Sequence, residues 1–191
     1  MLKYKTIEIK RLVYAEGQES DIHLFERRLG QELLQKVERH IADNDPPVVF
    51  YLGFNEISSI DFSCADEFVG KLVTRLLSDE YGKNYFVLLN LNENFQENIQ
   101  VALDRRKVAC LHRNSNENWS LMGYTKKYLV ETLNIVMDQG QITARELGKE
   151  LNLELTTSST RLFHLHKAHL VDRKQATMNG GGREYLYYKL F

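Results

Sequence analysis

The sequence contains little cysteine and proline and no long apolar run. Only two of its 191 residues are cysteine and two are proline. Cys64 and Cys110 lie far apart with no second pair, so the thiols cannot build a disulfide framework or a four-thiolate zinc site. The opening MLKYKTIEIKRLVY lacks the apolar core of a signal peptide, and no run reaches the about 20 apolar residues of a membrane span. We therefore expect a cytoplasmic protein without membrane contact, metal or cofactor.

The composition is that of a globular protein, with 43% hydrophobic and 27% charged residues. A net charge of −1 conceals an asymmetry: residues 1–122 carry 15 Lys+Arg against 19 Asp+Glu, and residues 123–191 carry 10 against 7. The net charges are thus −4 and +3. Because the polar stretch HRNSNENWS at 112–120 interrupts the apolar pattern, we predict two domains, 1–122 and 123–191, the second with an anionic partner.

Strand and helix patterns alternate in the first part, which predicts an α/β domain. The expected strands are Thr6–Val13, Val48–Gly53 and Tyr85–Asn92. The expected helices are Asp21–Ala42, with Asp21 as its N-cap, about Ser63–Asp79, and a third around Phe95–Leu103. The segments VACL and WSLMG, on either side of the polar stretch, predict a hairpin at the sheet edge.

The second part reads as three short helices followed by a hairpin, an α+β arrangement. A helix is expected from about Thr125 to Asp138, and Thr143 and Glu146 have the spacing of a capping box for the second helix. The third helix is expected to start at Thr156 or Thr157. The glycine-rich MNGGG at 178–182 predicts the turn of the hairpin.

The stretch ITARELGKELNLELTTSSTRLFHLHKAHLVDRK, residues 142–174, resembles the helix-turn-helix of bacterial winged-helix regulators. His169 stands where that family usually has glycine. The resemblance implies a winged helix-turn-helix domain that binds double-stranded DNA.

In such domains, short polar side chains at the start of the recognition helix form hydrogen bonds with base edges, and cations beside them contact the phosphates. The candidate DNA contacts are Thr157, Ser159, Thr160, Arg161, His164, Lys167, Arg173, Lys174 and Arg183. In the alternative interpretation the hydroxyls only cap a helix, the cations are solvated, and the winged helix binds a protein. His164 and His166 point about 200° apart on a helix, so a metal site is not expected.

The segment VVFYLGFNEISSIDFSCADEFVGKLVTRLL, residues 48–77, resembles STAS and STAS-like domains, known from bacterial anti-sigma-factor antagonists and sulfate-transporter tails. Asp61, Phe62, Ser63 and Cys64 occupy the positions of that family's Asp-Ser-Ser-Gly motif. The resemblance implies phosphorylation of Ser63 by a histidine-kinase-like ATPase. The alternatives are that Ser63 is only a helix N-cap, and that Cys64 is either a redox-sensitive thiol or a packed side chain.

These patterns predict a DNA-binding transcriptional regulator in which a STAS-like domain receives a signal or a protein partner. The alternative is a partner-switching module whose Ser63 turn binds an ATPase-fold kinase while the winged helix contacts protein. In a third interpretation, the protein is a regulatory module of a larger signalling or defence system. A homodimer would suit paired DNA half-sites. The sequence contains no catalytic motif, so we expect no enzyme.

Overall fold

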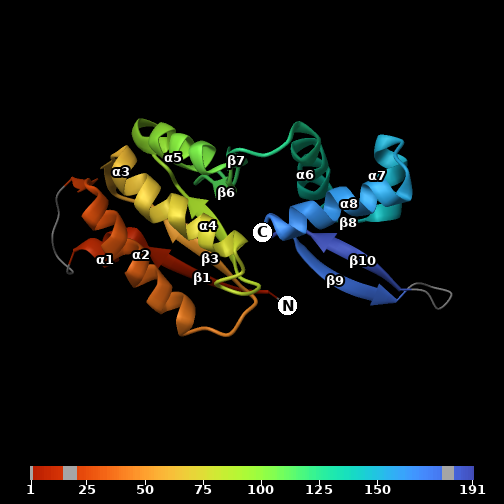
Figure 1. Cartoon of the computed structure of the whole chain (residues 1–191), viewed down its shortest axis with the longest axis horizontal. Coiled ribbons are helices and arrows are strands. Elements are labelled where there is room, and N and C mark those ends of the chain that lie inside the picture. The colour runs from red at the N-terminus through yellow and green to blue at the C-terminus, as the bar shows by residue number, and fades with distance from the viewer. Residues whose placement is uncertain (1, 15–20, 178–182) are drawn as a thin grey trace. The chain divides into compact units, whose positions relative to one another are not determined.

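The structure is a computed structural model that describes residues 2–14, 21–177 and 183–191 (Figure 1). It divides into two compact units, Met1–Tyr124 and Thr125–Phe191. None of the helices formed by the described residues has the length and hydrophobicity of a membrane-spanning segment.

The N-terminal unit is built on a five-stranded sheet in the order β1-β3-β5-β6-β7. Its first four strands in that order are parallel: β1 (Lys3–Glu8), β3 (Val48–Gly53), β5 (Tyr85–Leu89) and β6 (Ala109–Arg113). The edge strand β7 (Trp119–Gly123) runs antiparallel to β6, as the predicted hairpin requires. The predicted α/β fold class is confirmed.

Helices cover the sheet on the face where the hydrophobic core forms (Figure 1). They are α1 (Ile9–Val13), α2 (Arg27–Ala42), α3 (Phe62–Ala65), the π-helical turn η1 (Asp66–Gly70), α4 (Lys71–Leu77) and α5 (Glu93–Arg106). Each parallel connection steps in the same direction across the sheet, and right-handed crossovers then place their helices on one face. Val48, Phe50 and Leu52 of β3 belong to the core on this side.

Two predicted elements at the start of the chain are wrong. The strand expected over Thr6–Val13 ends at Glu8, and α1 follows. The helix expected from Asp21 begins at Arg27, because Ile22–Leu24 forms β2, which pairs in parallel with β4 (Ile57–Ile60). Burial alternates over β2, with Ile22 and Leu24 inside and His23 outside, which is a strand period. Asp21 therefore caps no helix, and its Oδ1 accepts a hydrogen bond from the Ser58 hydroxyl at 3.2 Å.

The helix expected over Ser63–Asp79 is present over Phe62–Leu77 as α3, η1 and α4 in direct succession, and the π-helical turn η1 carries an interior carboxylate. The Glu67 side chain is 1% exposed. It accepts hydrogen bonds from Arg27 at 2.7 Å and Gln31 at 3.2 Å, and it pairs with Lys71. Burial alone would raise the pKa of Glu67, but the bonds from Lys71 and Gln31 and the charges of Lys71 and Arg27 hold this pKa below its usual value.

A Glu67→Gln variant should have a free energy of unfolding about 1–3 kcal/mol lower than the wild type at pH 7, because a charged hydrogen-bond acceptor is lost. A carboxyl with a lowered folded-state pKa stabilises the protein above its unfolded pKa of about 4.3, and this contribution disappears as the pH falls through the folded-state pKa. Urea unfolding measures this contribution. The difference in the free energy of unfolding between pH 7 and pH 3 should be smaller in the variant than in the wild type. Glu32→Gln, at an exposed position of α2, is the control. Equal pH dependence in Glu67→Gln and wild type would contradict the assignment.

The C-terminal unit consists of three helices and a three-stranded antiparallel sheet in the order β8-β10-β9. Its elements are α6 (Lys127–Gln139), β8 (Gln141–Thr143), α7 (Ala144–Leu151), α8 (Leu155–Lys167), β9 (Asp172–Thr177) and β10 (Arg183–Tyr188). The capping box is present: Glu146 N donates to Thr143 Oγ1, and Thr143 N donates to Glu146 Oε2. The sequence did not predict β8. The predicted turn at 178–182 lies outside the described residues.

His169 ends the third helix in the conformation that glycine usually supplies. Its φ is +54°, directly after the C-cap residue Ala168. The Leu170 amide then donates to the Leu165 carbonyl at 3.1 Å, which closes the helix end. The departure from glycine at this position therefore does not prevent the helix stop.

Candidate nucleic-acid interface

Helix α8 presents an exposed surface that is mainly polar. Ser158, Leu162 and Leu165 point into the unit and are buried. Thr157, Ser159, Thr160 and His164 are exposed on the other side. From Leu155 to Lys167 the helix contains no carboxylate, and its N-cap residue Glu154 makes no side-chain capping bond. Four of the predicted contact residues thus lie on the outward surface of one helix.

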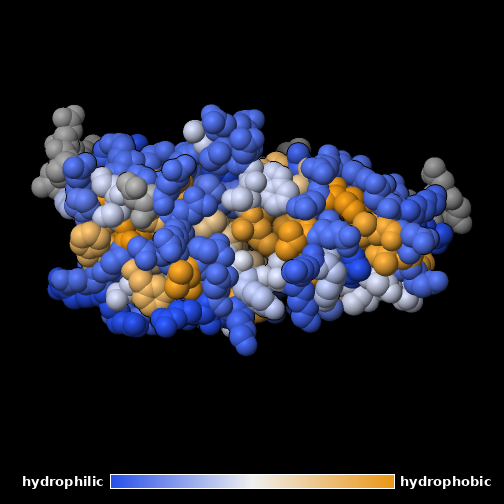
Figure 2. All heavy atoms as spheres, turned by 90° about the horizontal axis from the view of Figure 1, so that it is seen from above, coloured by the Kyte–Doolittle hydropathy of each residue, from blue (hydrophilic) through white to orange (hydrophobic). Residues whose placement is uncertain are grey.

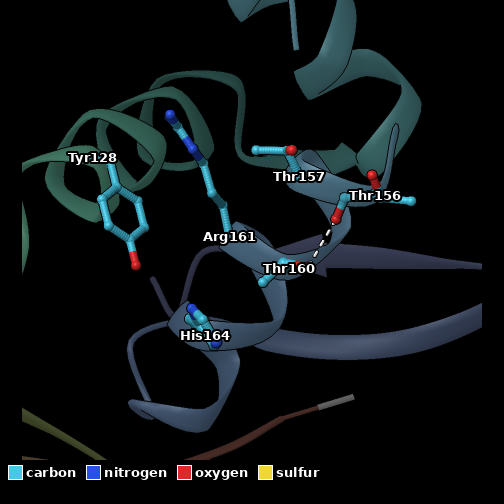
Figure 3. A pocket seen from close by; sticks show the side chains of 6 residues that line it. All are labelled: Tyr128, Thr156, Thr157, Thr160, Arg161 and His164. Carbon is cyan, nitrogen blue, oxygen red and sulfur yellow. Dashed lines mark hydrogen bonds between the residues drawn. The ribbon is translucent and has the colours of Figure 1, made fainter. Parts of the chain in front are cut away.

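A hollow of about 390 Å³ lies between this face and α6 (Figure 3). Tyr128 comes from α6, and the other lining residues, Thr156, Thr157, Thr160, Arg161 and His164, come from α8. The Thr160 hydroxyl donates to the Thr156 carbonyl at 2.8 Å, the dashed line of Figure 3. Hydroxyl, guanidinium and imidazole groups therefore share one concave surface.

The Arg161 side chain contacts two residues of α6. Its Nη1 donates to Glu131 Oε2 at 2.8 Å, and the guanidinium carbon lies 5.2 Å from the centre of the Tyr128 ring. The Arg161 side chain is 17% exposed, against 55% for Glu131. The cation is thus held against α6 rather than extended into solvent.

Aromatic rings hold the cations of the hairpin at the surface. Arg173 lies over Tyr185 at 4.2 Å and over Phe163 at 5.3 Å, and both rings are exposed. Lys174 lies over Tyr188 at 5.3 Å, with Asp172 at 3.9 Å. Stacking on a ring face restrains such a cation without burying it.

The last two predicted contacts lie at element ends. Lys167 is the exposed final residue of α8. Arg183 begins β10, and its side chain lies outside the described part of the structure.

A second, smaller hollow of about 220 Å³ lies where α7, α8 and β10 meet. Ser159 lines it together with Leu155 and Tyr185, which are 50% and 45% exposed. Figure 2 shows hydrophobic side chains at the surface of the C-terminal unit between hydrophilic ones. Ser159 thus shares its hollow with apolar side chains and with the charged residues Arg145 and Glu184, whereas Thr157 and Thr160 line the hollow beside Arg161.

The histidines at the end of α8 do not converge. His164 is exposed, His169 is buried, and His166 Nδ1 lies 3.2 Å from the Val171 carbonyl oxygen. Burial lowers the pKa of His166 and so favours the neutral imidazole. Within residues 2–14, 21–177 and 183–191, no three His, Cys, Asp or Glu side chains form a metal-binding group.

The turn around Ser63 in the N-terminal unit differs from two interpretations of the sequence. Asp61, not Ser63, is the N-cap: its Oδ1 accepts from the Cys64 amide at 2.7 Å and its Oδ2 from the Glu26 amide at 2.9 Å. Ser63 lies in the first turn of α3 and is half-buried. Cys64 is fully buried, and burial raises the pKa of its thiol to about 12. The interpretation of Cys64 as a redox-sensitive cysteine is therefore wrong, because such cysteines need an accessible thiolate.

Sequence reasoning missed the part of the site that α6 supplies. Tyr128 and Glu131 stand about 30 positions before Arg161, and no local pattern links them to it. Phe163 was also missed, because an aromatic residue in a helix usually indicates core. Only the packing of α6 and the hairpin against α8 brings these side chains to the site.

Comparisons with known proteins include a weak similarity to a solved structure. No protein-family model matches the sequence, and a search of curated proteins finds no relative. Among solved structures, a protein from Methanosarcina mazei Go1, described as a possible transcriptional regulator, is 23% identical with a TM-score of 0.33. The match covers 35% of this chain and 57% of that one. The geometry and charges of the site therefore carry the functional conclusion.

Proposed function

We propose that the C-terminal unit binds double-stranded DNA through α8 and the β9–β10 hairpin, and that the protein is a transcriptional regulator. The observation that carries the proposal is the exposed hydroxyl face of α8, which contains no carboxylate and is flanked by ring-supported cations. No catalytic step is assigned to it.

This surface has the chemistry that a DNA duplex requires. An α-helix fits the major groove, where threonine and serine hydroxyls bond to base edges and their methyl groups contact thymine. The first amides of α8 have no side-chain cap, and free helix-start amides suit a phosphate. Arg173, which lies over Phe163 of α8, supplies charge on the flank of the helix, and Lys174 supplies charge on the opposite face of the same strand.

The proposal is tested by the binding of a fluorescein-labelled duplex, with upstream sequences of the protein's own gene beside random sequence, over a salt series. Lys174→Ala should weaken binding to all sequences alike and lower the slope of log K against log salt by about 1. Lys83→Ala, which removes an exposed lysine of the N-terminal unit, is the charge-matched control. An absence of binding at low salt, or equal effects of the two variants, would contradict DNA binding by this surface.

For the N-terminal unit the proposed role is reception of a signal or a protein partner, as the resemblance to STAS-like domains implies. Ser63 keeps part of its surface exposed, and the guanidinium carbon of Arg105 lies 5.0 Å from the ring centre of the neighbouring Phe62. This cation offers a counter-charge beside the turn. Phosphorylation by an ATPase-fold kinase would make regulation depend on Ser63 and not on Lys174, so paired variants at these two residues separate partner switching from DNA binding.

A further inference from the structure

The hollow between α6 and α8 contains one permanently charged side chain. Its lining residues among the described part of the chain are an aromatic, three threonines, a histidine and Arg161, and no carboxylate lines it. Hydroxyls and a guanidinium with no carboxylate beside them are a lining suited to an anion.

The carboxylate that balances Arg161 approaches from α6, beside the hollow but not in its lining. Glu131 is more than half exposed and accepts one hydrogen bond from Arg161 Nη1, at 2.8 Å. An ion pair with one exposed partner contributes little net stabilisation, because water competes for the carboxylate. A phosphate that offers two oxygens to the planar guanidinium forms a stronger, bidentate contact.

We infer that this hollow takes a backbone phosphate of bound DNA, and that Glu131 competes with this phosphate for Arg161. The inference rests on the proposed function. A duplex lying on the exposed hydroxyls of Thr157 and Thr160 brings its backbone to the same surface, because both residues also line the hollow. Glu131 thereby lowers the affinity for DNA irrespective of sequence, since phosphate contacts carry no base information.

The test is Glu131→Gln, which keeps the size of this exposed side chain and removes its charge. We expect its duplex affinity to rise about 1.5- to 5-fold, the range that corresponds to losing one ion pair with an exposed partner, equally for candidate and random DNA. Glu150→Gln, which removes an exposed charge on α7, is the control for general electrostatics and should give a smaller gain.

A double variant decides whether Glu131 acts through Arg161. In an Arg161→Gln background, which retains much of the side-chain stem, the gain from Glu131→Gln should vanish. A gain that persists there, or an equal gain in Glu150→Gln, would overturn the competition. If the wild type binds DNA and Glu131→Gln gains nothing, only this inference fails; if the wild type binds no DNA, the proposed function itself fails. Thermal unfolding of each variant verifies that the C-terminal unit stays folded.

Discussion

A Gly123→Ala variant is expected to lose about 2–5 kcal/mol of the free energy of unfolding of the N-terminal unit. Gly123 ends β7 with a φ of +86°, which costs a residue with a Cβ about 1–2 kcal/mol. An added Cβ would lie 2.2 Å from the Val108 carbonyl oxygen and 2.7 Å from the Leu103 Cβ. Relieving these contacts moves the backbone between β6, β7 and α5, at about 1–3 kcal/mol.

Gly82→Ala separates the two contributions. Gly82 also has a positive φ, +59°, but its added Cβ would meet only the Pro46 ring, at 3.7 Å. It should therefore lose about 1–2 kcal/mol, the cost of the backbone conformation alone. Urea unfolding followed by the fluorescence of Trp119, the one tryptophan of the chain and a residue of β7, reports on this unit. Equal midpoints for the two variants would show that the space around Gly123 is not restrictive.

The second large effect concerns function. Thr157→Glu should reduce DNA affinity at least about tenfold, because a carboxylate facing phosphates costs several kcal/mol. The same change should leave the C-terminal unit as stable as before or raise its stability by about 0.3–1 kcal/mol, since an acidic side chain in the first turn of α8 is favourable. It would also stand four residues before Arg161, the favourable order for a helical ion pair.

Opposite effects on stability and binding distinguish an interface from a damaged fold. Duplex titration and thermal unfolding are measured on the same samples. Thr157→Gln, similar in size to the glutamate but uncharged, should lose much less affinity. If Thr157→Glu binds DNA as the wild type does, α8 does not face the duplex, and the proposed interface is contradicted.

Local patterns were sufficient to predict most of the C-terminal unit. The capping box of Thr143 and Glu146 and the apolar spacing of α8 involve residues three or four positions apart, so the neighbouring sequence determines them. The exposure of Thr157, Ser159, Thr160 and His164 follows from the same spacing, once the leucines of α8 face inward. The central parallel strands β3 and β5 were also predicted, because buried strands give continuous apolar runs.

Predictions failed where a residue's partner lies far away in the sequence. Ile22–Leu24 fits a helix by spacing until β4 pairs with it, and β8 is too short to recognise without β10 beside it. No pattern in the sequence indicated that Asp61 joins the starts of two helices by accepting hydrogen bonds from the Cys64 and Glu26 amides. Such bonds are formed only after the chain has folded.

The sequence by itself therefore determined the central strands and the longer helices, the charge difference between the two parts and the exposed polar groups of α8, because each depends on composition or on residues close together in the sequence. Tertiary structure alone decided that Cys64 is buried, that Glu67 is an ion-paired interior carboxylate, and that Arg161 is held by Glu131 and Tyr128. In each case the deciding group comes from another element. Burial and charge pairing depend on distances in space, and only packing sets those distances.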